Sequence, residues 1–284
     1  MPQIAPLRKA AGLLAACLAL SLLAGCATVA GTGRSQLNLV SDAELNQESA
    51  LAYKQVLAEG KLSSNRQDTA MIKRVGQRIA QAAQLLMASE GRAGDLAGYN
   101  WEFNLIDEPG TVNAFCMAGG KVAFYSGILP VCQDETGIAV VMGHEVSHAL
   151  ARHGAERVSQ QMAAEFGATV LGQVLGSSTS VSPLTAQMIM TGYGLGAQFG
   201  VLMPFSRAQE AEADRIGLSL MALAGYDPSA AVPFWERMRK ASGGAGVPAF
   251  LSTHPSDTAR IKGIQEYIPE ALARAGAAGV KIQP

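Results

Sequence analysis

The sequence predicts a mainly helical fold around a small mixed β-sheet. Two long segments, 41–59 and 69–88, carry apolar residues at helical spacing, and almost all of the chain from Gln133 onward has the same spacing. Between them, three short segments alternate apolar and polar residues as strands do: 101–106, 113–117 and 121–125. We therefore expect one helical domain with its few strands near the middle of the chain.

The composition excludes several classes of protein. The chain has 284 residues, of which 49% are hydrophobic, and a formal net charge of −1. This is too apolar and too weakly charged for a disordered protein. It offers no basic face for nucleic acid, so we expect no nucleic-acid partner. Four cysteines are too few for a small disulfide-stapled protein, whereas the length allows a sizeable core.

The first 25 residues are typical of a targeting segment. Arg8 and Lys9 precede an uncharged apolar stretch over 10–24, which is short for a membrane-spanning helix. The stretch ends in Leu23-Ala24-Gly25-Cys26, which resembles a bacterial lipobox. We expect a lipoprotein signal peptide over 1–25, with lipidation at Cys26. That places the protein facing the periplasm, anchored by lipid, at the outer membrane of a Gram-negative bacterium. The alternative is an ordinary signal peptide that happens to contain a cysteine.

The remaining chain divides into a tether, one domain and a tail. Residues 26–40 are predicted to be a tether. Ser41 and Glu44 form a capping box that starts a helix, and the folded domain is expected over 41–270. Residues 271–284 are predicted to be a flexible tail.

Cys116 and Cys132 are the cysteines left beyond Cys26. In an oxidising compartment such an even pair suggests a disulfide, but two buried free thiols fit the sequence as well.

One long stretch carries no charge. Residues 166–206 contain no Asp, Glu, Lys or Arg in 41 positions. Four glycines interrupt the part that is apolar enough to span a membrane, 184–205. We favour apolar helices or a lid over a groove, and keep a membrane span as the alternative.

Residues 144–148 read His-Glu-Val-Ser-His inside a helical pattern. Histidines at positions i and i+4 lie on one helix face, so His144 and His148 can bind one Zn²⁺, while Glu145 can act as general base. The alternative is a pair of helix-face histidines satisfied by local hydrogen bonds.

A third zinc ligand is expected downstream. Ser206 and Gln209 form a second capping box, which puts Glu210 near the start of a helix and Asp214 one turn later. We expect Glu210 to bind the metal and Asp214 to hold a ligand imidazole. The alternative is an acidic helix surface, because Glu212 lies between them.

Together these motifs resemble the HtpX/CAAX-prenyl-endopeptidase (Oma-like) family of zinc metallopeptidases, and within it the bacterial periplasmic lipoprotein branch (LoiP/BepA-like). The match covers roughly residues 101–267, although Ala118 departs from the proline common in relatives. The resemblance implies a zincin-like (gluzincin) metalloprotease domain with one Zn²⁺ per chain, bound by His144, His148 and Glu210.

Further roles follow from that resemblance. The segment Lys121, Val122, Ala123 and Phe124 would be an edge strand to which an extended substrate adds; otherwise it belongs to a purely structural hairpin. His254 would be a displaceable fourth ligand or an oxyanion donor, or else a helix-capping loop residue. Arg260 would share the oxyanion role or pair with an acid. His153 is predicted not to bind the metal, because helix geometry rotates it away from the ligand face.

We therefore expect a zinc endopeptidase in which Glu145 activates a water molecule. The resemblance implies that its substrates are unfolded, misfolded or stalled cell-envelope proteins. The alternative is a periplasmic lipoprotein with chaperone-like substrate binding and a structural or latent zinc site.

Overall fold

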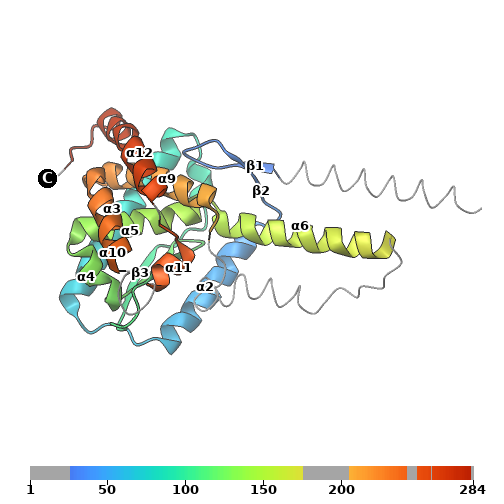
Figure 1. Cartoon of the computed structure of the whole chain (residues 1–284), viewed down its shortest axis with the longest axis horizontal. Helices are drawn as coiled ribbons and strands as arrows, with labels where there is room; N and C mark the ends of the chain where they lie inside the picture. Colours follow the sequence, from blue (N-terminus) through green and yellow to red (C-terminus); the bar gives the residue numbers. More distant parts are fainter. Residues whose placement is uncertain (1–25, 175–204, 242–247, 257, 283–284) are drawn as a thin grey trace, which may run out of the picture.

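The computed structural model describes residues 26–174, 205–241, 248–256 and 258–282. The mainly helical fold with a small mixed sheet is confirmed (Figure 1). The longer helices are α2 (Asp42–Glu59), α3 (Arg66–Ser89), α5 (Glu135–Leu150), α6 (His153–Val174), α9 (Arg207–Leu223), α10 (Ala231–Ala241) and α12 (Thr258–Ala277). Shorter ones are α4 (Leu129–Cys132), α11 (Ala249–Thr253), η1 (Ala93–Leu96), η2 (Ser126–Ile128) and η3 (Pro228–Ala230).

Side-chain caps set where the main helices start. Ser41 accepts a hydrogen bond from the backbone N–H of Glu44, and Ser206 forms a full capping box with Gln209, as the sequence predicts. Asn65 starts α3 and Asp134 starts α5 in the same way.

The three-stranded sheet has the order β3-β5-β4, with β3 (Glu102–Ile106), β4 (Ala114–Met117) and β5 (Lys121–Tyr125). β5 runs parallel to β3 and antiparallel to β4, so the sheet is mixed. Gly119 and Gly120 link β4 to β5 with φ of +75° and +79°, a conformation that favours glycine.

This order corrects the prediction of the substrate strand. Lys121, Val122, Ala123 and Phe124 lie in β5, which is hydrogen-bonded on both sides and therefore has no edge for a substrate. Alternation along a strand indicates which face a side chain occupies, but not which strands are neighbours. The outer strands are β3 and β4, one on each side of β5.

Helices cover both faces of this sheet. Val122 and Phe124 point into the main core with α3 and α5, whereas Ala123 packs against Tyr53 of α2. The Tyr53 hydroxyl donates to the Val122 carbonyl at 2.5 Å, which ties α2 to the central strand. Helix α5 therefore lies in the interior and is buried from Gly137 to Leu150.

Two predicted flexible segments are folded. Residues 26–40, expected to be a tether, contain a hairpin of β1 (Cys26–Thr28) and β2 (Ser35–Leu37), with Val29 and Ala30 buried between the strands. The expected tail, 271–284, begins inside α12, where Ala271 and Ala275 are buried. The predicted signal peptide, 1–25, lies outside the described residues, so lipidation at Cys26 stays a prediction.

Cys116 and Cys132 are free thiols, so the disulfide prediction is wrong; of the two, Cys132 is buried and Cys116 is only partly buried. Cys116 lies on β4, whereas Cys132 is buried at the end of α4, on a separate element. Within the described ranges, no helix has the length and apolar character needed to cross a membrane. The predicted lid, groove or span over 166–206 falls largely outside those ranges.

Candidate metal centre

Helix α5 presents His144, Glu145 and His148 from the interior of the domain. The Asp134 carboxylate caps the helix by accepting from the Gly137 N–H at 2.9 Å. One turn separates the two histidines, so their rings lie on the same face, with centroids 4.7 Å apart. Both are almost fully buried, at 2% and 4% exposure.

A contact between two glycines brings α9 against this helix. A Cβ on Gly217 would lie 3.0 Å from backbone atoms of Gly143 and His144, and a Cβ on Gly143 would lie 2.9 Å from the Gly217 carbonyl oxygen. Only glycine permits this approach, and it lets Glu210, near the start of α9, reach the histidines of α5.

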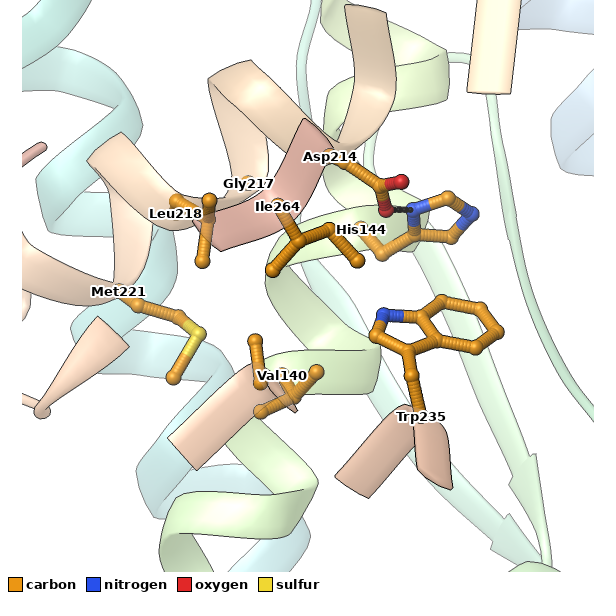
Figure 2. Close-up of a pocket in the computed structure, with 9 residues that line it drawn as sticks. Val140, His144, Asp214, Gly217, Leu218, Met221, Trp235 and Ile264 are labelled. Carbon is orange, nitrogen blue, oxygen red and sulfur yellow. Dashed lines mark hydrogen bonds and ion pairs between the residues drawn. The ribbon is translucent and has the colours of Figure 1, made fainter. Parts of the chain in front are cut away.

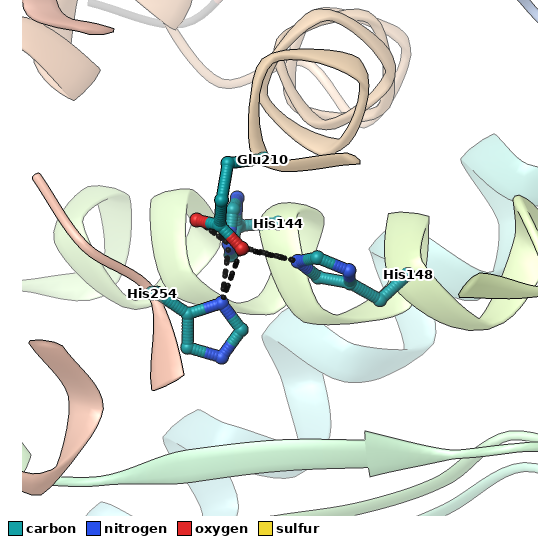
Figure 3. A group of neighbouring side chains, drawn as sticks. All are labelled: His144, His148, Glu210 and His254. Carbon is teal, nitrogen blue, oxygen red and sulfur yellow. Dashed lines mark hydrogen bonds and ion pairs between the residues drawn. The ribbon is translucent and has the colours of Figure 1, made fainter. Parts of the chain in front are cut away.

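Four buried side chains converge here, and we refer to His144, His148, Glu210 and His254 as the metal cluster (Figure 3). The Nε2 atoms of His144 and His148 are 3.1 Å apart. Glu210 Oε1 lies 3.3 Å from His148 Nε2 and 3.0 Å from His254 Nδ1. The potential ligand atoms of all four residues lie within 4.8 Å of one another.

The surrounding hydrogen bonds leave this arrangement suited to bind a cation. Asp214 Oδ1 lies 3.0 Å from His144 Nδ1, and a carboxylate only accepts, so Nδ1 carries the proton and Nε2 presents a lone pair. Burial also lowers the pKa of both ligand imidazoles, that of His148 strongly, which keeps them neutral. Two imidazoles and a carboxylate are ligands that Zn²⁺ prefers, so the donor set fits one zinc ion.

Glu145 lies beside this cluster on α5. Its Oε1 is 3.3 Å from His254 Nε2 and makes no hydrogen bond among the described residues. The backbone N–H of Cys116 on β4 also faces this carboxylate and favours its charged form. Burial raises the pKa of Glu145 to about 7, because the charge of His254 offsets only part of the lost hydration. A carboxylate with this pKa is suited to accept and release protons near neutral pH.

Arg260 holds two acids of α9. Its Nε and Nη2 donate to Asp214 at 2.7 and 2.9 Å, and its Nη1 lies 2.5 Å from Glu210 Oε2. The guanidinium also stacks on Trp235, 3.8 Å from the ring centroid. Of the two predicted roles, the structure shows pairing with acids. Burial alone would raise the pKa of Glu210, but the charges of His254 and Arg260 hold it well below its usual range.

His254 points into the cluster from the end of α11, and both ring nitrogens face carboxylates. Nδ1 lies near Glu210 and Nε2 near Glu145. Burial lowers its pKa, but these two carboxylates outweigh burial and raise it. The ring is thus placed where a fourth ligand or an oxyanion donor would be, and the helix-capping alternative does not describe it.

Some neighbours of the cluster are not evident from the sequence. Phe205 stacks on His148, with centroids 3.9 Å apart, and on His254 at 5.3 Å. Its position just before the Ser206 capping box is the one signal that could have indicated it. Behind His144, Trp235 and Ile264 line a small apolar pocket that supports the imidazole (Figure 2).

Comparison with known proteins shows which family the chain resembles. The model of peptidase family M48 matches residues 66–268. The chain is 39% identical over 227 residues to the mitochondrial metalloendopeptidase OMA1 of Schizosaccharomyces pombe, covering 78% of this chain and 60% of that protein. It is 29% identical over 247 residues to human mitochondrial metalloendopeptidase OMA1, covering 85% and 45%. The beta-barrel assembly-enhancing protease of Escherichia coli is 33% identical over 153 residues, covering 53% and 31%.

These relatives correct the predicted location. The proteins that match most of the chain are named as mitochondrial and come from fungi, plants and animals. The prediction of a periplasm-facing protein at a Gram-negative outer membrane is therefore wrong. It relied on the lipobox-like residues before Cys26, a short pattern that carries little information by itself.

The chain spans 60% or less of the length of each of the three relatives described above. The family model nevertheless includes every residue of the metal cluster as well as Glu145, Asp214 and Arg260. The chain belongs to peptidase family M48.

Proposed function

We propose that this protein is a zinc-dependent endopeptidase that cleaves unfolded protein segments. The observation that carries the proposal is the buried carboxylate of Glu145 beside the metal cluster, with one oxygen that has no hydrogen-bond partner in the described part of the chain. A purely structural zinc site has no use for a base next to its ligands. This argues against the alternative of a chaperone-like binder with structural zinc.

The residues divide into ligands and a base. His144, His148 and Glu210 would hold the ion, and Asp214 fixes the His144 ring through Nδ1. When bound, zinc lowers the pKa of a water molecule and polarises the scissile carbonyl. Glu145 accepts the proton of the attacking water and then delivers it to the leaving amine.

The outer edge of β4 is the place where we propose that substrate pairs. Among the described residues β4 has no second strand partner, and the backbone N–H of Cys116 faces Glu145. An extended peptide added along β4 would therefore run past the base. Backbone pairing gives affinity with little dependence on side chains, which suits unfolded substrates of varied sequence.

The finer substrate class, misfolded or stalled cell-envelope proteins, is also a proposal. Its support is the name of two relatives, the beta-barrel assembly-enhancing proteases of Yersinia pestis and Escherichia coli.

The test compares the zinc-loaded full chain with two variants on fluorescently labelled unfolded casein. Glu145→Gln should keep one zinc per chain and lose cleavage by about 10²–10⁴-fold, the usual contribution of a general base. Glu135→Gln is the matched control, because it removes a carboxylate from the same helix where it pairs with Arg74, and it should cleave normally. Equal cleavage by wild type and Glu145→Gln would refute the proposal.

A third variant separates the two roles of His254. His254→Ala should cleave faster than wild type if the ring is a displaceable ligand, and about 10²-fold more slowly if it stabilises the oxyanion. If the wild type and His254→Ala both retain zinc and neither cleaves, the endopeptidase proposal fails.

A further inference from the structure

His153 lies outside the metal cluster, yet it is fully buried and contacts one of its ligands. Helix α5 ends at Leu150, and Arg152 adopts φ of +56°, which turns the chain before α6 begins at His153. The ring therefore points back toward α5, with Nδ1 2.8 Å from His148 Nδ1. His153 lies outside the group of side chains that could hold one ion, and what places it there is this break rather than rotation along one continuous helix.

The second nitrogen of His153 faces a carboxylate. Glu212 Oε2 lies 2.9 Å from His153 Nε2. A carboxylate only accepts, so Nε2 of His153 carries the proton, and in the neutral ring its Nδ1 is left as an acceptor. That acceptor in turn requires the proton of His148 to be on Nδ1. The Nε2 of His148 is then free to face the metal cluster.

Glu212 is fixed by the N-terminal hairpin. Its two oxygens accept from the Thr32 hydroxyl and, at 2.8 Å, from Arg34 Nε. The other two nitrogens of the same guanidinium donate to Glu156 on α6, at 2.7 and 2.8 Å. Arg34 thus joins α6, which begins with His153, to α9, which carries Glu212. We refer to Arg34, Glu156, Glu212 and His153 as the hairpin cluster.

Both imidazole ligands of α5 are supported by carboxylates of α9. His144 donates directly to Asp214, whereas His148 reaches Glu212 through the ring of His153. A buried ion-pair cluster that served only for stability would not need a histidine whose acceptor nitrogen meets the Nδ1 of a metal ligand. Groups that orient a metal-binding imidazole have this arrangement.

We propose that His153, Glu212 and Arg34 are positioning residues that set the proton position and ring orientation of His148, so the N-terminal hairpin is part of the metal-binding apparatus. This inference rests on the zinc site of the proposed function. It assigns to residues 26–37 a role in zinc affinity that their distance in sequence from the metal cluster does not suggest.

The experiment measures zinc affinity of the full chain by competition with a chelator of known affinity. His153→Leu removes both hydrogen bonds and should weaken zinc binding about 10–100-fold, the usual effect of losing a group that orients a ligand. His153→Gln should retain most of the affinity, because one amide can accept from His148 and donate to Glu212. The zinc affinity of Arg34→Met should lie between those of His153→Leu and His153→Gln. Arg215→Met, which breaks an ion pair with Glu270 from the same helix α9, is the matched control and should bind as wild type.

A second readout is independent of activity. Co²⁺ in place of zinc gives visible absorption bands that report ligand geometry, and these should change in His153→Leu but not in Arg215→Met. Wild-type affinity and an unchanged cobalt spectrum in folded His153→Leu would overturn the inference. If His153→Leu does not fold, wild-type affinity in both His153→Gln and Arg34→Met would overturn it. A wild-type chain that binds no zinc would instead overturn the proposed function.

Discussion

Two buried polar clusters lie side by side in this protein and are joined by the contact between His148 and His153. In the hairpin cluster every carboxylate faces a donor: Glu156 faces Arg34 and Gln209, and Glu212 faces Arg34 and His153. In the metal cluster Glu210 also faces donors, Arg260 and His254, but the Nε2 lone pairs of His144 and His148 face each other and the same carboxylate. Burial and charge are common to both clusters, so neither of these two properties identifies a metal site. The convergence of two imidazole lone pairs on one carboxylate does, because a metal cation binds these ligands.

The largest effect is expected from Glu210→Leu. It removes the carboxylate that faces Arg260 and His254, and loss of one partner from a buried ion pair costs about 3–5 kcal/mol. It also removes a ligand, so chelator should lower the unfolding midpoint of wild type but leave that of the variant unchanged. Urea unfolding with and without zinc measures both. A variant that is still stabilised by zinc would contradict the assignment of Glu210 as a ligand.

The next largest effect is expected from Gly217→Ala. The new methyl would press on the backbone of α5, at a cost of about 1–3 kcal/mol for overpacking, and would move Glu210 away from the histidines. Zinc affinity should fall together with stability. Gly276→Ala in α12 is the control, because nothing lies within 4 Å of its added Cβ. Unchanged zinc affinity in Gly217→Ala would show that the glycine contact does not position the cluster.

Arg34→Met should have a smaller effect, and one that depends on pH. Burial raises the pKa of Glu156 and Glu212, but hydrogen bonds from Arg34 and His153 outweigh it and leave both below the usual value. The folded pKa is thus lower than the unfolded value of about 4.3. The stabilisation is therefore present above pH 4.3 and is lost as the pH falls through the folded values.

In melting experiments at pH 7, the free energy of unfolding of Arg34→Met should be about 2 kcal/mol lower than that of wild type, the usual contribution of hydrogen bonds to charged groups. The difference from wild type should narrow as the pH falls below about 4.3 and close below the folded pKa values. A difference that stays constant from pH 7 to pH 3 would mean that these carboxylates do not carry it.

The smallest effect is expected from Arg215→Met. Its pairing with Glu270 lies on the partly exposed side of α9, where ion pairs contribute at most about 1 kcal/mol. Thermal melting should show a small shift that fades at high salt. A loss as large as that of Arg34→Met would remove the distinction between buried and surface pairs on this helix.

Local sequence patterns were sufficient to predict the fold class and the candidate metal ligands. The spacing of His144 and His148 and the Ser206 capping box place three of the four members of the metal cluster on two helices. These features depend on residues within a few positions of one another, which a single sequence displays directly. The same holds for the β4–β5 turn at Gly119 and Gly120.

Features that depend on distant pairing were missed. The position of β5 inside the sheet depends on β3, which alternation does not reveal. Residues 26–40 are polar enough to resemble a tether, but Arg34 is satisfied by two acids more than 120 residues away. The role of His153 depends on the turn at Arg152, where a residue other than glycine adopts positive φ.

The spacing of the ligands along the chain has a thermodynamic consequence. A metal bound between His148 and Glu210 acts as a cross-link that closes a loop of about 60 residues. In the chain-entropy model, such a cross-link lowers the conformational entropy of the unfolded state by an amount worth about 4 kcal/mol of stability. Closure entropy grows only with the logarithm of loop length, so doubling this connection would add only about 0.6 kcal/mol to the cost of closing it. The segment between α6 and α9 can therefore change greatly in length while the ligands at its two ends stay in place.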